Sequence, residues 1–553
     1  MATGRRRNAA MVRRLRWVGH DPTLPSVESA PDLARLDVVP TPSQNSPAPD
    51  PALLPTEGSA GVPTTPGQLE LLRRALEVLT EMAPAAVELG ELFRAAGHEL
   101  ALVGGPVRDA FLGRASNDLD FATSADPDQT QALLAAWGDA HWDIGKEFGT
   151  IGAKRFAPSG SPRGAGDLVV EVTTYRTDEY DPASRKPLVA FGDTLVGDLS
   201  RRDFTVNAMA VRVPEMVFVD PHDGLADLAL GVLRTPIAPE RSFDDDPLRM
   251  MRAARFAAQL GFEVEPATRA AIVDMAARIE IVSAERVRDE LTKLLLSGDP
   301  RKGLEVLVET GLADHVLPEL PALRLEIDEH HRHKDVYQHS LTVLEQAIAQ
   351  ETGPDGVVPG PDLVLRLASL LHDIGKPATR RFESGGGVSF HHHEVVGAKL
   401  TAKRLKALRF DKDTVKQVSR LVELHLRFHG YGEGEWTDSA VRRYVTDAGP
   451  LLERLHRLTR ADSTTRNKRK AQRLSDAYTD LEQRIERLRG EEELASIRPD
   501  LDGQQIMEAL GISPGPEVGQ AYKFLLELRM DRGPLDEDAA REELLRWWAA
   551  RDA

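Results

Sequence analysis

Two aspartates, Asp118 and Asp120, stand one residue apart in the apolar segment NDLDFAT. Side chains at positions i and i+2 of a strand point to the same face, so this spacing places two carboxylates close together. Both stay ionised only if a cation lies between them, and Mg²⁺ prefers carboxylate and phosphate oxygens. The pair predicts a metal site for phosphoryl or nucleotidyl transfer. The alternative is a solvated acidic turn.

A glycine pair, Gly104-Gly105, lies just upstream in the segment ELALVGGPVRDAFLG, which is typical of a strand followed by a helix. Glycine lets backbone N–H groups approach a phosphate closely, and the N-terminus of a helix adds partial positive charge. Arg108 lies about one turn into that helix and can reach the same phosphates. The segment predicts a triphosphate-binding turn, although such a turn can also be purely structural.

A third carboxylate, Glu171, lies inside a second apolar strand in the segment DLVVEVTTYR. An acid buried in a strand is costly unless it is paired or bound to a metal. We therefore predict that Glu171 is a metal ligand or a base that helps to activate an attacking hydroxyl. The alternative is a structural ion pair, for example with Arg176.

In the segment DLSRRDFTVNAMAV, charged residues precede an apolar stretch, and Asn207 interrupts it. Residues 204–213 are expected to form a strand, and an amide within such a stretch must hydrogen-bond a specific partner. Arg202, Asp203 and Asn207 are therefore predicted to contact a triphosphate and its sugar. The alternative for Asn207 is a helix cap or a core amide.

Three arginines, Arg249, Arg252 and Arg255, recur every third residue in the segment DDDPLRMMRAARF. Pro247 suits the first turn of a helix, where this spacing keeps the arginines on one face. Asp246 lies about one turn before Arg249, and a carboxylate with a guanidinium can match the polar edge of a base. The stripe predicts nucleotide contacts, or else an exposed face of salt bridges. The opposite face is expected to supply the packing: Leu248, Met251, Phe256 and Leu260.

Histidines concentrate in the C-terminal half, with ten of the sixteen between residues 330 and 429. His372 and Asp373 end an apolar helix, and His339 and Asp462 stand far from them in the sequence. Mixed nitrogen and oxygen ligands of this kind suit a divalent metal. Lys376 could contact an anionic substrate. Further histidines could hold a second metal or a phosphate: His391, His392, His393, His425 and His429.

Composition limits the class of protein. The 553 residues include 70 Lys and Arg against 87 Asp and Glu, a net charge of −17, and no cysteine. This charge argues against non-specific coating of nucleic acid but allows a local basic track, such as the run 466–473. The missing cysteine excludes a disulfide scaffold and thiolate metal sites, and no apolar run is long enough to cross a bilayer. A cytoplasmic protein without membrane contact is predicted.

These segments, in this order and spacing, resemble bacterial class II CCA-adding tRNA nucleotidyltransferases and their poly(A) polymerase relatives, over roughly residues 85–330. The resemblance implies addition of C, C and A to the 3′ end of tRNA from CTP and ATP, with Mg²⁺ on Asp118 and Asp120. It also implies base selection by Asp246 and Arg249. The family usually has Glu-Asp before the proline. The shorter Asp245 found here could alter the orientation of Arg249.

The histidine pattern resembles the HD superfamily of metal phosphohydrolases, whose fold can also serve RNA binding without turnover. Two alternatives to CCA addition stay open: a poly(A) polymerase on the same scaffold, and an HD phosphohydrolase with an RNA-binding head.

The expected fold class is α+β, with a small mixed-sheet head followed by helical domains. The expected division is a disordered Pro-rich extension (1–66), a nucleotidyltransferase head (67–235), a helical neck for nucleotide selection and RNA binding (236–325), an HD-type domain (326–465) and a helical, tRNA-binding tail (466–553).

Overall fold

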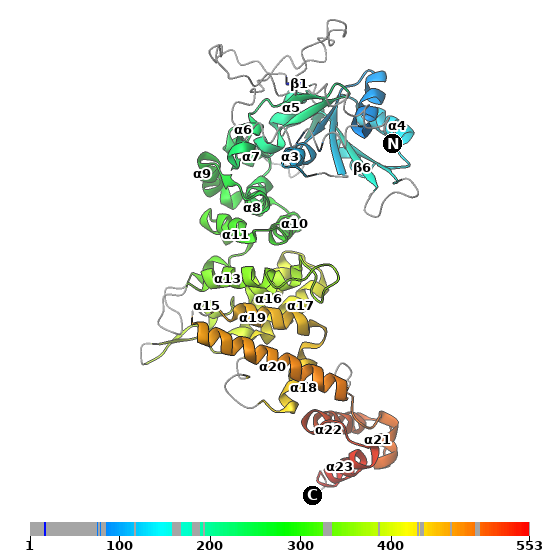
Figure 1. Ribbon diagram of the computed structural model, residues 1–553, viewed down its shortest axis with the longest axis vertical. Helices are drawn as coiled ribbons and strands as arrows, with labels where there is room; N and C mark the ends of the chain where they lie inside the picture. Colours follow the sequence, from blue (N-terminus) through cyan, green and yellow to red (C-terminus); the bar gives the residue numbers. More distant parts are fainter. Residues whose placement is uncertain are drawn as a thin grey trace. The chain divides into compact units, whose positions relative to one another are not determined.

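The computed structural model describes residues 16–17, 75, 78, 84–114, 118–157, 167–179, 188–191, 194–324, 335–384, 387–428, 431, 436–464, 467–492 and 498–551 (Figure 1). Within the expected disordered extension, 1–66, only Arg16–Trp17 is described, and these two residues form the short strand β1. His429 and Arg466 lie outside the described residues. The chain divides into two compact units, Met1–Ser283 with Lys302–His315, and Ala284–Arg301 with Val316–Ala553.

The first unit is built on a mixed sheet of eight strands in the order β1-β10-β9-β2-β3-β6-β5-β4. The central pair, β3 and β6, is parallel, whereas β2 pairs with β3, β6 with β5 and β5 with β4 in antiparallel fashion. The expected α+β class with a mixed sheet in the head is thus confirmed. The strands are β1 Arg16–Trp17, β2 Leu100–Val103, β3 Asp118–Thr123, β4 Ala140–Trp142, β5 Thr150–Arg155, β6 Leu168–Thr174, β9 Ala210–Val213 and β10 Val217–Val219.

Helices of the first unit begin where short polar side chains or prolines favour a helix start. Asp126 forms a capping box with Gln129 at the start of α4, Thr194 caps α5, and Pro247 precedes α8. Gly261, in the left-handed conformation, ends α8. The helices are α3 Gly105–Phe111, α4 Pro127–Trp137, α5 Leu195–Ser200, α6 Gly224–Leu230, α7 Pro239–Asp245, α8 Leu248–Leu260 and α9 Pro266–Met275, followed by α11 Pro300–Glu309 and α12 Leu312–Val316.

The strand expected over residues 204–213 is only half correct. Thr205–Asn207 forms a 3₁₀ turn, η4, and the strand β9 begins at Ala210. The turn forms because one carboxylate oxygen of Asp203 accepts hydrogen bonds from both the backbone of Phe204 and the side-chain amide of Asn207. Local side-chain bonds of this kind compete with a sheet ladder.

The described part of the second unit is helical, apart from a short hairpin of β13 (Arg381–Phe382) and β14 (Val388–Ser389). Six buried aliphatic residues form a separate small core under the last three helices: Leu501, Ile506, Ala521, Leu525, Ala540 and Leu544. No described helix has the length and apolarity to cross a bilayer. The main helices are α10 Ala284–Leu295, α13 Val336–Ile348, α14 Leu363–Leu371, α16 His393–Ala407, α17 Lys412–Leu424, α18 Asp438–Ala448, α19 Leu452–Asp462, α20 Lys468–Glu492, α21 Gly503–Leu510, α22 Pro516–Arg532 and α23 Glu537–Ala549.

Candidate functional site

Three carboxylates share one face of the head sheet. Asp118 and Asp120 point away from the buried face of β3, and Asp120 is the register partner of Glu171 on the parallel strand β6. All three side chains are exposed, whereas Leu119, between the two aspartates, and Val170, just before Glu171, are buried. The expected burial of Glu171 is wrong, because alternation along β6 turns it to the open face. The three carboxylates form the acidic face of the head.

The electrostatics of this acidic face favour a cation. Although exposed at its edge, Asp120 has lost enough surrounding water to raise its pKa to about 6. The positive charge of Arg202 opposes the rise, and the negative charges of Glu171 and Asp118 add to it. A divalent cation would relieve this repulsion, so the three carboxylates fit the metal site predicted from the spacing of Asp118 and Asp120.

The predicted phosphate turn lies beside Arg202. Gly104 has a φ of +71°, which favours glycine, and a Cβ added there would lie 2.9 Å from Nη1 of Arg202. Arg202 is held by Asp198, a fully buried carboxylate that also accepts hydrogen bonds from Arg201. Burial raises the pKa of Asp198, but the two guanidiniums bring it below its usual value. The sequence reasoning missed Asp198; its spacing of three and four residues from two arginines was the available signal.

A chain of buried polar contacts joins the other predicted phosphate ligands. Arg108 donates to Oδ1 of Asn207 over 2.7 Å, and the amide of Asn207 donates to Asp203 over 2.9 Å. Arg252 donates to the second carboxylate oxygen of Asp203 over 2.7 Å. Despite burial, Arg252 and Asn207 hold the pKa of Asp203 well below its usual range. The structure therefore brings Arg108, Asn207, Asp203 and Arg252 into one network.

Phe256 is buried and packs against Phe204, as expected of the packing face, but its expected separation from the arginines is wrong. The guanidinium carbons of Arg255, Arg108 and Arg252 lie 3.9, 5.2 and 5.5 Å from the centre of its ring. Phe256 follows Arg252 by four residues, a spacing that brings side chains together on a helix. The negative face of one buried ring attracts three positive charges, which gathers the arginines.

Asp246 and Arg249, the pair predicted to select the base, have unequal surroundings. Arg249 is only 6% exposed and donates from Nη1 to the Ser242 hydroxyl over 2.8 Å and from Nη2 to the carbonyl of Arg201. Asp246 is half-buried and accepts the backbone N–H of Leu248 over 3.1 Å. Because Arg249 and Arg255 are both buried, the alternative of an exposed face of salt bridges is wrong for them. Base selection by Asp246 and Arg249 stays a prediction.

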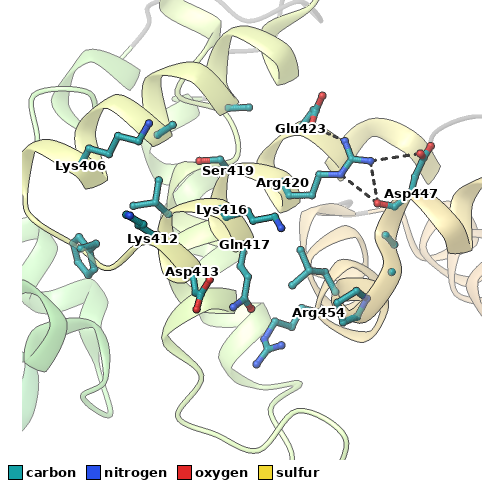
Figure 2. A pocket seen from close by; sticks show the side chains of 18 of the residues that line it. Lys406, Lys412, Asp413, Lys416, Gln417, Ser419, Arg420, Glu423, Asp447 and Arg454 are labelled. Carbon is teal, nitrogen blue, oxygen red and sulfur yellow. Dashed lines mark hydrogen bonds and ion pairs between the residues drawn. The ribbon is translucent and has the colours of Figure 1, made fainter. Parts of the chain in front are cut away.

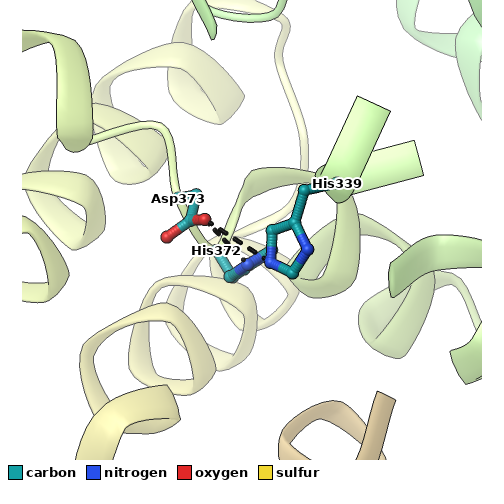
Figure 3. A group of neighbouring side chains, drawn as sticks. All are labelled: His339, His372 and Asp373. Atoms are coloured by element: carbon teal, nitrogen blue, oxygen red, sulfur yellow. Dashed lines mark ion pairs between the residues drawn. The ribbon is translucent and has the colours of Figure 1, made fainter. Parts of the chain in front are cut away.

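The four predicted HD residues meet in the second unit, and Figure 3 shows three of them. Nε2 of His339, on α13, lies 2.9 Å from Oδ1 of Asp462 at the end of α19. Nε2 of His372 lies 3.2 Å from Asp373 and 3.5 Å from Asp462. His372 and Asp373 follow directly after α14 and are buried. Residues distant in the sequence are thus brought together at one point.

Two further histidines complete this group, which we call the histidine cluster. Nε2 of His393 and of His425 lie 3.3 and 3.9 Å from Oδ1 of Asp373. Their ligand atoms and that of Asp373 lie within 4.8 Å of one another, as do those of His339, His372 and Asp373. Three histidines follow one another at 391–393, so the sequence could not show which of them joins the cluster. In the structure His393 is buried, whereas His391 and His392 are exposed.

Hydrogen bonds on the far side of each ring orient the histidine cluster. Nδ1 contacts a backbone carbonyl in three histidines, at Ser369 for His372 (2.9 Å), Phe390 for His393 (2.8 Å) and Val422 for His425 (2.6 Å). These carbonyls accept the Nδ1 protons and leave each Nε2 to face Asp373. Those three Nε2 atoms have no hydrogen-bond partner among the described residues. Such outer-shell bonds are typical of metal-binding histidines.

The charge of the histidine cluster also fits a cation. Burial alone would lower the pKa of His372, but the negative charges of Asp373 and Asp462 raise this pKa to about 10. Lys376 lies 2.9 Å from Asp373 and adds a positive charge. Burial and the charge of His372 lower the pKa of His425 to about 3. Without metal, a proton on His372 balances the carboxylates; a metal would replace that proton.

A separate hollow of ≈ 890 Å³ lies along α16, α17 and the 3₁₀ turn η8 (Gly449–Leu451). Figure 2 shows lysines on its walls beside Arg420, which is bound by Glu423 and Asp447. Lys406, Lys412 and Lys416 are exposed and have no ion pair within the described part of the chain. None of the predicted site residues lines this hollow.

Comparisons with known proteins cover most of the chain. Residues 100–234 match the family described as "Poly A polymerase head domain", 261–323 match "Probable RNA and SrmB- binding site of polymerase A", and 336–467 match "HD domain". The A-adding tRNA nucleotidyltransferase of Deinococcus radiodurans is 35% identical over 454 residues, which are 81% of this chain and 95% of that protein.

The CC-adding tRNA nucleotidyltransferase of Thermus thermophilus is 32% identical over 82% of this chain and 94% of its own length. A CCA-adding enzyme of Lactobacillus delbrueckii subsp. bulgaricus is 30% identical over 82% and 94% of the two chains. In fold, the chain is similar to the CCA-adding enzyme of Bacillus stearothermophilus solved with CTP, with a TM-score of 0.58 and 24% identity, over 84% of this chain and 98% of that one.

Proposed function

The chain belongs to the tRNA nucleotidyltransferase/poly(A) polymerase family, and on that premise we propose that it adds C, C and A to the 3′ end of tRNA. CTP and ATP are the substrates, and pyrophosphate is released at each step. The observation that carries the proposal is the acidic face, Asp118, Asp120 and Glu171, beside the guanidinium of Arg202. Carboxylates next to a phosphate-binding group are what metal-assisted nucleotidyl transfer needs.

Asp118 and Asp120 would hold Mg²⁺, which, when bound, lowers the pKa of the attacking hydroxyl and stabilises charge on the leaving pyrophosphate. The 3′-hydroxyl of the RNA attacks the α-phosphate of the incoming nucleotide, a new phosphodiester bond forms, and the bond to pyrophosphate breaks. Glu171, the neighbour of Asp120 in the sheet register, would accept the proton of that hydroxyl.

The triphosphate would lie at the Gly104-Gly105 turn, against Arg108 and Arg202. Both arginines are pre-oriented, Arg108 by Asn207 and Arg202 by Asp198. Fixed guanidiniums stabilise developing phosphate charge without reorganising during the reaction. Arg252 and Arg255 contribute to the same positive region through Phe256.

The base would be selected by the side chains at the start of α8. Asp246 presents a carboxylate and Arg249 a guanidinium, an acceptor and a donor that together can match the polar edges of cytosine and adenine. Arg249 is already oriented by Ser242 and the carbonyl of Arg201. The protein itself would therefore act as the template for the choice of nucleotide.

The exposed basic residues of α20, Arg469, Lys470 and Arg473, support tRNA binding by the segment 466–553. None of the three has an ion pair within the described residues. tRNA, CTP and ATP are soluble substrates of the cytoplasm, where we propose that the enzyme acts.

A product-length assay tests the proposal. Purified protein is incubated with a tRNA ending at the discriminator base and with CTP alone, ATP alone or both. Two added residues with CTP alone and three with both nucleotides support CCA addition. One relative is named for the addition of A alone and another for the addition of CC alone, so the assay must separate these two activities from complete CCA addition. Addition of CC only, or of A only to a tRNA ending in CC, or a long A ladder, contradicts the proposal.

The histidine cluster supports a second function, a metal-dependent phosphohydrolase. The specific observation is the convergence of His339, His372, His393 and His425 on Asp373 and Asp462, with Nε2 atoms facing the carboxylates. A divalent metal bound there would activate a water for attack on a phosphate ester. Phosphatase activity lost in His372→Ala and kept in Asp118→Ala would support it. Loss in both variants, or no activity with any divalent metal, would leave the HD-type fold as an RNA-binding structure without turnover.

A further inference from the structure

A row of register-paired residues crosses the head sheet from the acidic face to the edge strand β4. The registers pair Asp120 with Glu171, Glu171 with Gly152 and Gly152 with Trp142 across the strands β3, β6, β5 and β4. Register partners point to the same face of a sheet, and neighbouring strands lie about 4.8 Å apart. Trp142 therefore stands on the same face as the three carboxylates, two strands away from Glu171.

The indole of Trp142 leans over the strand that separates it from Glu171. A Cβ added to Gly152 would overlap Cε2, Cζ2 and Nε1 of Trp142, so the indole covers the space above this glycine. Gly152 is the residue directly between Trp142 and Glu171 in the row. The absence of a side chain at 152 lets the ring lie beside the acidic face. Trp142 remains half-exposed, with part of its surface open to solvent.

The order of the strands places this ring on the side from which the nucleophile must approach. The phosphate turn, Gly104-Gly105, directly follows β2, which flanks β3 on one side, whereas β6, β5 and β4 lie on the other. In phosphoryl transfer the attacking and leaving oxygens lie roughly in line on opposite sides of the phosphorus. Because the pyrophosphate leaves toward the phosphate turn, the attacking hydroxyl arrives from the side of Glu171 and Trp142.

We propose that Trp142 binds the RNA, by stacking against the nucleobase of the 3′-terminal nucleotide whose hydroxyl attacks. This inference rests on the proposed nucleotidyl transfer and deepens it by naming a contact for the RNA primer and not for the incoming nucleotide. Stacking on an aromatic ring tolerates any base, because every base has a flat π face. A primer end that changes with each addition needs this tolerance.

The surroundings of Trp142 suit a single-stranded RNA end. Ile144 and Phe148, on the turn between β4 and β5, are 87% and 43% exposed, and Phe156 at the end of β5 is 56% exposed. Exposed apolar and aromatic side chains at one sheet edge are typical of an interaction surface. Lys146 and Lys154 lie along the same edge, and each is paired with an aspartate. The edge thus offers mainly flat apolar surface, because the aspartates neutralise its two lysines.

The test compares Trp142→Ala, Trp142→Leu and Trp142→Phe in the full-length chain, with Leu230→Ala as the control for an exposed apolar residue, on α6 of the same unit. The first measurement is steady-state CMP addition with tRNA and CTP varied separately. We expect about a tenfold rise in the KM for tRNA in the alanine and leucine variants, an unchanged KM for CTP, and recovery of most of the affinity in the phenylalanine variant.

The second measurement reports stacking directly. A tRNA whose 3′-terminal nucleotide is 2-aminopurine is titrated with each protein, and its fluorescence should be quenched by the wild type and by Trp142→Phe. Weaker quenching by Trp142→Leu, which fills the same space without a ring, separates stacking from folding; thermal melting checks that each variant is folded.

Three results separate the outcomes. Wild-type protein that adds no nucleotide contradicts the proposed function itself. Active wild type with equal quenching and equal KM for tRNA in Trp142→Leu overturns the role of Trp142. A rise in the KM for CTP alone overturns it as well, because the ring would then contact the incoming nucleotide.

Discussion

The acidic face of the head and the histidine cluster both gather acids, but they do so in opposite surroundings. Asp118, Asp120 and Glu171 are exposed on an open strand face, whereas His372, Asp373 and His425 are almost wholly buried. The acidic face lacks a complete shell of protein ligands and leaves room for substrate phosphates beside a cation. The histidine cluster offers several nitrogens and oxygens oriented by backbone carbonyls.

The contrast indicates how two candidate metal sites in one chain can differ in their dependence on substrate. An open carboxylate site gains affinity only when a nucleotide brings further oxygens, so the cation and the substrate arrive together. A buried site with second-shell hydrogen bonds can hold a metal by itself. Variants that damage one site and spare the other therefore test whether the two are independent.

The largest expected effect is at the acidic face. Asp118→Ala or Asp120→Ala should lower the rate of nucleotide addition by about a thousandfold or more, because each removes charge that stabilises the transition state. Gel analysis of extended tRNA measures the rate, and a binding assay should show tRNA affinity close to wild type. Asp128→Ala, at an exposed site on α4, is the control. Normal addition by either variant would rule out the metal-site assignment.

The next effect concerns the histidine cluster. His393→Ala should weaken divalent metal binding by about 10–100-fold, the usual loss when a ligand or its support is removed. His391→Ala, an exposed histidine two residues away, should leave metal affinity unchanged. Isothermal titration with Mn²⁺ or Zn²⁺ measures both, and CCA addition should be unaffected in each variant. Equal metal affinity in the two variants would contradict the cluster as a metal centre.

A smaller effect is expected at the base-selecting side chains. Arg249→Ala should lower the preference for CTP over UTP by about tenfold while the maximal rate falls less, since one bidentate base contact is worth about 1–3 kcal/mol. Competition between CTP and UTP on a single tRNA measures the preference. Arg241→Ala, an exposed arginine on α7, is the control. Unchanged selection of nucleotides would count against templating by Arg249.

The smallest effect is on the pH profile. The pKa of Asp120 is raised to about 6, so the protonated acid is favoured as the pH falls below that value. Only the ionised form can bind a cation, and addition at low Mg²⁺ should therefore rise with pH through about 6. Higher Mg²⁺ should move this midpoint to lower pH, because the cation stabilises the ionised carboxylate. A midpoint that does not move with Mg²⁺ would contradict direct binding at Asp120.

Local patterns predicted much of the candidate site. Strand alternation was enough to place Asp118 and Asp120 together, and the i, i+3 spacing was enough to place Arg249, Arg252 and Arg255 on one side of α8. The α+β class and the mixed sheet were also predictable, because alternating strands and helices follow from hydrophobic periodicity. In each case the relevant neighbours are only a few residues apart in the chain.

These local patterns could not predict contacts between segments that are distant in the sequence. Phe256 was expected in the packing face, yet three arginines surround it, one of them, Arg108, from another helix. The exposed position of Glu171 depends on which face of β6 is covered, and the row from Asp120 to Trp142 depends on strand order and register. A single-residue slip in register would reverse these faces.

The sequence by itself determined the chemistry that the chain carries: paired strand acids, a glycine turn, an arginine helix and a set of histidines and aspartates without cysteine. Those identities settle which cations and phosphates can be bound, since ligand preference is a property of the side chains. Only the tertiary structure decided which acids are exposed, which histidines of a consecutive run face Asp373, and which ring stands beside Glu171. Burial and register depend on long-range packing, so they arise only when the strands and helices assemble.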